Sequence, residues 1–293
     1  MRILFVTSNR LGDAVLSTGL LDHLIRAHPD ARIDVACGPA AVGVFDRMPN
    51  RARTIVVEKR PYGRHWLSLW ADVATTRWDL VVDIRASALS WLIPARRRAV
   101  LRRRPGHKTA ELAAMLGLDP PPAPVAWFAP EDSRAAEALL PPGRRIVALA
   151  PTANWQPKTW PPERFAALFE RVAETLLPGA VPVVLGGPGA FERAMADPLL
   201  ALLPSAVDLA GRLTIPQAAA LLSRCALFVG NDSGLMHLAA AAGAPTLGLF
   251  GPTDASGYAP VGRRARAAVS SDGTMAGIAV DDASAAAAEL LGA

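Results

Sequence analysis

The stretch Ser8-Asn-Arg-Leu-Gly-Asp13 joins an apolar, strand-like run to a run whose apolar residues recur at helical spacing. Loops at the carboxyl ends of parallel strands are where open α/β sheets bind their ligands. A carboxylate at Asp13 could cap the helix or complement its dipole, or it could project from the loop as a general base. The residue types alone leave both interpretations of Asp13 open.

A second polar stretch, Val229-Gly-Asn-Asp-Ser-Gly-Leu-Met-His237, also follows a strand-like run and opens a helix. Gly230 and Gly234 let backbone N–H groups approach an anion, Ser233 can donate a hydroxyl, and the start of a helix favours negative charge. The alternative is an ordinary helix start that is capped by the Asn or Asp of the loop. No Gly-Lys-Ser/Thr follows, so the stretch is not a Walker loop.

Lys158 lies in a third polar loop, residues 152–160, which follows the apolar run that ends at Ala150. A lysine near a phosphate-binding helix would neutralise a departing diphosphate. A solvated surface lysine is the alternative. The turn Gly186-Gly-Pro-Gly189 follows another strand-like run and could also face a nucleotide, although a short glycine cluster is weak support.

Six arginines fall within residues 96–104, between Pro94 and Pro105. This run could form a strand or a short helix, and it could contact acidic lipid head groups or a phosphorylated acceptor. A solvated basic face is the alternative. No nucleic-acid-binding module surrounds the run, so nucleic acid is not an expected partner.

Composition excludes several classes of protein. Of the 293 residues, 51% are hydrophobic and 19% are charged, which excludes intrinsic disorder, and the net charge of +5 favours anionic partners. No apolar run approaches the ~18 residues of a membrane span, and we expect a soluble, cytoplasmic protein. Aspartates spaced as Asp-x-Asp, histidines at ligand spacing and a Gly-x-Ser-x-Gly elbow are all missing, so no metal site or serine hydrolase is expected.

The polar loops require a regular succession of strands and helices to position them. Strand-like and helix-like runs alternate in both halves of the chain, which predicts parallel sheets covered by helices. Seven prolines between positions 120 and 142 interrupt the alternation and predict a linker without a continuous helix. We therefore expect an α/β protein with two doubly wound domains, residues 1–125 and 144–293, joined by a linker at 126–143, with a ligand in the cleft between them. The expected strands lie at 2–7, 32–36, 54–57, 80–84, 145–150, 181–185, 226–229 and 246–250, and the expected helices at 13–27, 162–175, 190–202, 216–224 and 234–242.

Several of these motifs together resemble those of glycosyltransferase family 9, the heptosyltransferase family. The resemblance is carried by Leu11-Gly-Asp-Ala-Val-Leu-Ser-Thr18, by Lys158-Thr-Trp-Pro161 and by Asn231-Asp-Ser-Gly-Leu-Met-His237 with Phe250-Gly-Pro-Thr-Asp254 downstream. A segment from His107 to Leu118 is similar to a helix of the family. On the acceptor side the stretch Asp83-Ile-Arg-Ala-Ser87 departs from the family pattern.

The resemblance implies a GT-B fold, with two Rossmann-like domains that face each other across a cleft. The N-terminal domain would bind the acceptor and the C-terminal domain, which ends in a helix, the nucleotide sugar. It also implies an inverting, metal-independent transfer of a heptose-like sugar from an ADP-linked donor to a lipopolysaccharide core or another cell-envelope glycan. No cofactor is implied besides this nucleotide-sugar co-substrate. A nucleotide-sugar epimerase of the same fold, or a non-catalytic nucleotide- or sugar-binding relative, is the alternative.

Carried over by position, the resemblance assigns Asp13 as the general base and Lys158 as the cation that binds the diphosphate. It places the other donor contacts at Thr152 beside the diphosphate, Glu192 at the ribose, Leu213 at the adenine, Asp232 at the sugar, Ser233, Gly234 and Leu235 in the anion-binding turn, and His237 at the pocket wall. A glycolipid or glycan acceptor would suit a peripheral contact with the anionic inner face of the cytoplasmic membrane, to which the arginine run could contribute.

Overall fold

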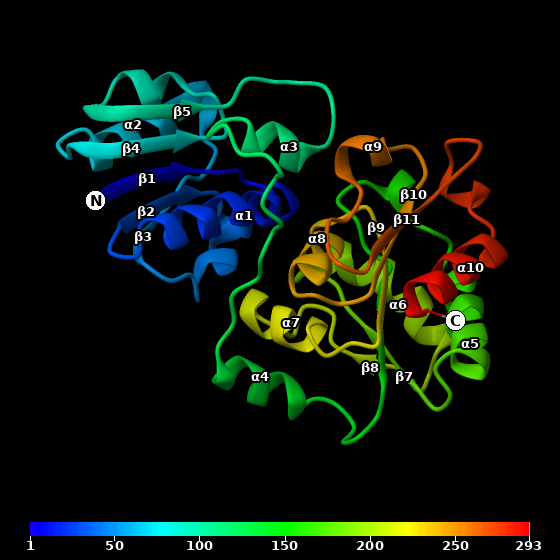
Figure 1. The fold of residues 1–293 in the computed structure, drawn as a ribbon. Helices are drawn as coiled ribbons and strands as arrows, with labels where there is room; N and C mark the ends of the chain where they lie inside the picture. Colours follow the sequence, from blue (N-terminus) through cyan, green and yellow to red (C-terminus); the bar gives the residue numbers. More distant parts are fainter. Residues whose placement is uncertain (293) are drawn as a thin grey trace. The chain divides into compact units, whose positions relative to one another are not determined.

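The computed structural model describes residues 1–292; Ala293, the last residue of the expected C-terminal domain, lies outside them. The chain divides into two compact units, Met1–Trp127 and Phe128–Ala293 (Figure 1). Each unit has its own parallel sheet with helices packed on it, as the alternation of strand-like and helix-like runs predicts. Within residues 1–292 no helix is both long and apolar enough to cross a membrane.

The first unit is built on a five-stranded sheet with the order β3-β2-β1-β4-β5. The central strands are buried runs of aliphatic residues, which is the pattern of a parallel sheet covered on both faces. Its elements are β1 (Arg2–Val6), α1 (Leu11–Ala27), β2 (Arg32–Cys37), η1 (Pro39–Phe45), β3 (Arg51–Val56), η2 (Pro61–Gly63), α2 (Arg64–Val73), β4 (Trp78–Asp83), η3 (Ala88–Trp91), β5 (Ala95–Val100) and α3 (Lys108–Ala113).

The second unit is built on a six-stranded sheet with the order β11-β10-β9-β6-β7-β8. Trp160 and Phe165 meet edge to face in its apolar core. Its elements are α4 (Pro130–Glu137), β6 (Ile146–Ala150), η4 (Gln156–Lys158), α5 (Pro162–Thr175), β7 (Val181–Val184), α6 (Ala190–Leu202), β8 (Val207–Asp208), α7 (Ile215–Leu222), β9 (Leu227–Asn231), α8 (Gly234–Ala241), β10 (Thr246–Phe250), α9 (Ala255–Tyr258), β11 (Ala265–Val269), η5 (Met275–Gly277) and α10 (Val280–Leu291).

The proline-rich stretch forms no continuous helix across the expected linker at 126–143, but it does contain one short helix, α4. Pro130 is the first residue of α4, where a proline costs nothing because the first N–H groups of a helix have no partner within it. Asp132 accepts a hydrogen bond from the backbone N–H of Ala129 at 2.9 Å, and an ion pair joins Glu137 to Arg224. The helix packs against α7 and belongs to the second unit.

Candidate active site

Each sheet changes its direction of growth beside its own first strand, β1 or β6. In the second unit the chain runs outward from β6 through β7 to β8, then returns to place β9 on the other side of β6. In the first unit β2 and β4 flank β1 in the same way. Ligands of doubly wound proteins bind outside the carboxyl ends of the strands at this point. Three of the polar loops identified in the sequence follow β1, β6 and β9.

Asn231 ties together the loops that follow β6 and β9. The side chain is fully buried; its amide N–H donates to the carbonyl oxygen of Pro151 at 2.8 Å, and its amide oxygen accepts from the backbone N–H of Trp160 at 3.0 Å. The Trp160 indole N–H donates to Ile278 O at 3.1 Å. Both ends of the loop that contains Lys158 are therefore fixed to the second unit.

The structure brings Lys158 and Asp232 together from two separate loops. Lys158 Nζ donates to Asp232 Oδ2 at 2.6 Å, and both side chains are mostly buried. Lys158 is therefore not the solvated surface lysine of the alternative interpretation. The pair places a cation and an acceptor of hydrogen bonds beside the start of α8.

The start of α8 presents a buried hydroxyl. Ser233 is the N-cap residue, yet its side chain makes no capping bond, and its Oγ is buried without a hydrogen-bond partner among residues 1–292. The same holds for the Oγ1 of Thr253, in the loop after β10. Buried hydroxyls are normally paired, so these two donors fit a polar ligand. Gly234 and Leu235 supply the first N–H groups of the helix, where an anion is favoured.

The alternative interpretation, in which an Asn or Asp caps this helix, is wrong. Asn231 belongs to the end of β9 and holds the neighbouring loop, while the Asp232 carboxylate pairs with Lys158. His237 lies on the first turn of α8 and is buried. The turn therefore keeps its helix N-terminus without a side-chain cap.

The remaining predicted donor residues are Thr152 and Leu213, on the loops that follow β6 and β8, and Glu192, in the first turn of α6. Thr152 is buried, and a Cβ on Gly186 would come within 3.1 Å of its methyl group, so Gly186 permits the close approach of the two loops. Glu192 turns back from α6, and its Oε2 accepts from the backbone N–H of Gly187 at 3.0 Å. Leu213 is half-buried, just before α7.

The end of the downstream signature caps a helix. Asp254 is the N-cap of α9 and accepts from the hydroxyl and the backbone N–H of Ser256 at 2.9 and 2.8 Å. These two hydrogen bonds hold the pKa of Asp254 below its ordinary value. This carboxylate therefore shapes the loop next to Thr253.

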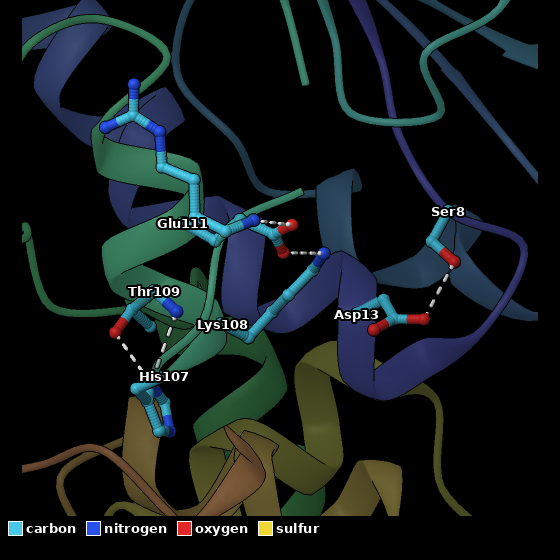
Figure 2. A network of polar contacts seen from close by, with 7 residues as sticks. Ser8, Asp13, His107, Lys108, Thr109 and Glu111 are labelled. Carbon is cyan, nitrogen blue, oxygen red and sulfur yellow. Dashed lines mark hydrogen bonds and ion pairs between the residues drawn. The ribbon is translucent and has the colours of Figure 1, made fainter. Parts of the chain in front are cut away.

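In the first unit Asp13 lies in the opening turn of α1 and is half exposed (Figure 2). The N-cap is Arg10, and no side chain caps this helix, so the capping interpretation of Asp13 is wrong. The Asp13 carboxylate instead accepts from the hydroxyl of Ser8 at 3.2 Å. Its position still complements the helix dipole, and a half-exposed carboxylate held by one hydroxyl can also accept a proton.

The loops after β1 and β4 are joined beside Asp13. Arg85 donates to the Asn9 side-chain oxygen at 3.1 Å. The loop after β4 is organised by Asp83, a fully buried carboxylate that accepts from the backbone N–H groups of Arg85 and Ser87 and from the hydroxyls of Ser87 and Ser90. The stretch that departs from the family pattern is thus a turn that Asp83 organises and that Arg85 links to the loop after β1.

The helix α3 adds a second group of charges to the first unit. It packs against α1, and Lys108 pairs with Glu111 at 2.5 Å (Figure 2). His107 is the N-cap, and its ring nitrogen accepts from the backbone N–H of Thr109 at 3.2 Å. Among residues 1–292 no group of three or more His, Cys, Asp or Glu side chains is arranged to hold a metal ion.

Three features of the site were not predicted from the sequence. They are the Asn231 bridge, the buried Thr253 hydroxyl and the turn around Asp83. An Asn that directly ends a wholly apolar run is the sequence signal for the first, because a buried amide needs buried partners. We find no sequence signal for the other two.

Comparison with known proteins gives consistent matches. The family model of glycosyltransferase family 9 (heptosyltransferase) matches residues 78–282. Lipooligosaccharide heptosyltransferase 2 of Haemophilus influenzae is 42% identical over 59 residues, which span 20% of this chain but only 17% of that protein. A family 9 glycosyltransferase from Veillonella parvula has a TM-score of 0.82 and 23% identity, over 99% of this chain and 97% of that one. The ADP-heptose lipopolysaccharide heptosyltransferase II of E. coli has a TM-score of 0.79 and 22% identity, over 99% and 98%. These structures confirm the prediction of two doubly wound sheets of the GT-B class.

Proposed function

The chain belongs to glycosyltransferase family 9 (heptosyltransferase), and from this premise we propose that it transfers a heptose-like sugar from an ADP-linked donor to a hydroxyl of a lipopolysaccharide core or another cell-envelope glycan. The observation that carries the proposal is the Lys158–Asp232 pair beside the uncapped start of α8. A mostly buried cation next to a helix N-terminus is an arrangement that stabilises a diphosphate.

On the donor side, Lys158 neutralises the charge that develops on the leaving diphosphate. Ser233 donates its unpaired hydroxyl, and the N–H groups of Gly234 and Leu235 face the phosphate oxygens. Asp232 hydrogen-bonds the sugar. We place Thr152 beside the diphosphate, Glu192 at the ribose, Leu213 at the adenine and His237 in the wall of the pocket.

On the acceptor side, Asp13 is the general base. As the acceptor oxygen attacks C1 of the sugar, its proton passes to the Asp13 carboxylate, and the C1–O bond to the diphosphate breaks on the opposite face. A single displacement of this kind inverts the configuration at C1. The charge released with the nucleoside diphosphate is met by Lys158 and the start of α8, so the transfer needs no metal ion.

Two other functions would use the same donor half. A nucleotide-sugar epimerase would convert its donor without an acceptor. A non-catalytic relative would bind nucleotide, but would form no product with any acceptor, and changing Asp13 would alter neither property. Asp13 favours the transferase, because a half-exposed carboxylate at the strand-order switch of the first unit has no use in nucleotide binding alone.

Calorimetric titration with ADP, UDP, GDP, CMP and NAD, without added metal, tests the proposal. We expect ADP to bind most tightly. A preference for UDP or GDP would keep the fold and the displacement but exclude an ADP-linked heptose as the donor. If none of the five binds, the transferase proposal fails at its donor site.

The proposed acceptor is a glycolipid, which suggests that the protein works as a peripheral protein at the inner face of the cytoplasmic membrane. Five of the six arginines in the run suit such a contact, because Arg96, Arg97 and the three arginines at 102–104 are exposed. Arg98 is committed elsewhere: its guanidinium donates to the carbonyl oxygens of Ser90, Ile93 and Ala95.

A further inference from the structure

Two short helices of the first unit cover the same face of its sheet. α2 buries Leu69 and Val73 against it, and the segment of η3 buries Leu89 and Ile93 in the same apolar cluster. These residues account for the sides of the two helices that face inward.

The outward sides of the same two segments carry exposed apolar residues as well. Leu67, Trp70, Trp91 and Leu92 are between 44% and 69% exposed. The indole N–H of Trp70 donates to the carbonyl oxygen of Leu92 at 3.1 Å, which places α2 beside η3. Leu67 lies one turn before Trp70, on the same side of the helix. We call these four residues the aromatic patch; an exposed apolar cluster of this kind marks a surface that meets a partner.

The segment around the aromatic patch is strongly basic. Residues 58–104 contain eleven Lys and Arg but only four Asp and Glu, a net charge of +7 that exceeds the +5 of the whole chain. The charge is also coupled to the patch, because the Arg98 guanidinium lies 5.7 Å from the centre of the Trp91 ring.

A hollow of about 330 Å³ opens next to the patch, and Trp91 forms part of its lining. Ala99 and Met115 supply apolar lining, while Arg102 and Arg104 are exposed side chains that also contribute to it. Guanidinium groups beside an indole provide charge and hydrogen-bond donors for a phosphate, together with an apolar surface for the chain attached to it.

We propose that the aromatic patch docks on the surface of an anionic phospholipid bilayer, an inference that rests on the peripheral membrane contact of the proposed function and names the side chains that make it. Trp and Leu side chains enter the interfacial region, where indole rings are favoured, and the surrounding arginines meet the lipid phosphates. A second copy of the chain is disfavoured as the occupant, because a two-fold contact through this patch would bring two segments of charge +7 together.

Co-sedimentation of the full chain with vesicles tests this without donor or acceptor, so its outcome is independent of the glycosyl transfer proposed above. We expect binding to vesicles of phosphatidylcholine with phosphatidylglycerol, weak binding to phosphatidylcholine alone, and a loss of binding at high salt. The double variant Trp91→Ser, Leu92→Ser should weaken binding at least about tenfold, because two apolar side chains no longer leave water. The matched control is Leu202→Ser, Val269→Ser, two exposed apolar residues of the second unit that should not matter.

A second measurement covers the case in which the double variant folds poorly. Brominated lipids in the anionic vesicles should quench tryptophan fluorescence, and Trp91→Phe should reduce the quenched fraction whereas Trp155→Phe, at an exposed indole of the second unit, should not. The proposal is overturned if the wild-type chain ignores anionic vesicles, or if it binds neutral vesicles equally well. It is also overturned if the folded serine variant binds like wild type, or if the patch instead mediates a dimer that the variant abolishes.

Discussion

Each of the two sheets changes its direction of growth beside its first strand, yet the two units carry different chemistry at this position. In the second unit this position holds a mostly buried ion pair, an amide that joins two loops and a hydroxyl that finds no partner among residues 1–292. In the first unit it holds Asp13, half exposed and held by one hydroxyl bond of 3.2 Å. The shared topology therefore determines where a ligand can bind, and the loop residues determine whether the place suits an anion or a proton transfer.

The difference also concerns rigidity. The loops of the second unit are held by hydrogen bonds that Asn231 makes to two backbone groups, so Lys158 keeps its place before any ligand arrives. Preorganised charge is what stabilises a developing anion, because no reorganisation is then needed during the reaction. A general base needs only to contact the acceptor hydroxyl and to be deprotonated itself, and a half-exposed carboxylate can meet both requirements.

The largest effect should come from Asp13→Asn. Removing the base should lower the transfer rate by about 10²–10⁴-fold, which is the usual contribution of general base catalysis. ADP affinity should stay at the wild-type value, since the change lies in the other unit. Rate measurements with a glycan acceptor, together with calorimetry for ADP, check both parts. Ser8→Ala should cost far less, and transfer by Asp13→Asn near the wild-type rate would remove the residue from the mechanism.

The Asn231 bridge should matter most for stability. Asn231→Ala leaves the carbonyl of Pro151 and the N–H of Trp160 without partners, and we expect a loss of about 2–4 kcal/mol in the free energy of unfolding. Denaturant unfolding measures this loss. Asn154→Ala, an exposed residue in the same loop, is the control.

Two cysteines can show in which unit that loss occurs. Burial raises the pKa of both Cys37 and Cys225 to about 12, with a smaller contribution from Asp46 at Cys37. Neither thiol should then react with a thiol reagent near neutral pH while its unit is folded. In Asn231→Ala, Cys225 should be labelled faster and Cys37 at the wild-type rate. Equal acceleration at both thiols would show that loss of the Asn231 bridge destabilises both units and not the second unit alone.

The core of each fold could be predicted because the central strands are short buried runs of aliphatic residues. The strand β11 could not, since Ala265 to Val269 is a mixture of alanine and arginine at the edge of the sheet, with only one residue buried. The helix α4 was missed because a proline at the first position of a helix has the opposite meaning from one in its interior.

The contacts that join the candidate site residues could not be predicted from the sequence. The pairing of Lys158 with Asp232 spans 74 positions and depends on β6 and β9 being neighbours, which no local pattern contains. The role of Asn231 depends on the same adjacency. The sequence does not distinguish Asp13 from a helix cap, because only the structure shows that the helix begins earlier, at Leu11, with Arg10 at the N-cap position.

A smaller effect, on ligand affinity alone, is expected for Lys158→Ala. Losing a charge-assisted contact to the diphosphate should weaken ADP binding by about 1–3 kcal/mol, measured by calorimetry. Lys108→Ala is a close match, because Lys108 is also mostly buried and paired with a carboxylate at 2.5 Å, but in the first unit. Its ADP affinity should be unchanged. If both variants lose affinity equally, the assignment of the anion site to the second unit alone is wrong.

The smallest effect is expected for Glu192. Each unit uses a carboxylate to hold a loop near its strand-order switch, but Asp83 accepts four hydrogen bonds whereas Glu192 accepts one from Gly187. Glu192→Ala should therefore weaken ADP binding only about threefold, because one exposed loop loses one contact. Glu192→Gln keeps an acceptor for the Gly187 N–H and should retain most of the affinity.

If Glu192 also bonds the ribose, the alanine variant should bind ADP and 2′-deoxy-ADP equally, while the wild type prefers ADP. If Glu192→Ala still prefers ADP over 2′-deoxy-ADP, Glu192 does not contact the ribose. Its carboxylate then only holds its loop, as the Asp83 carboxylate does in the first unit.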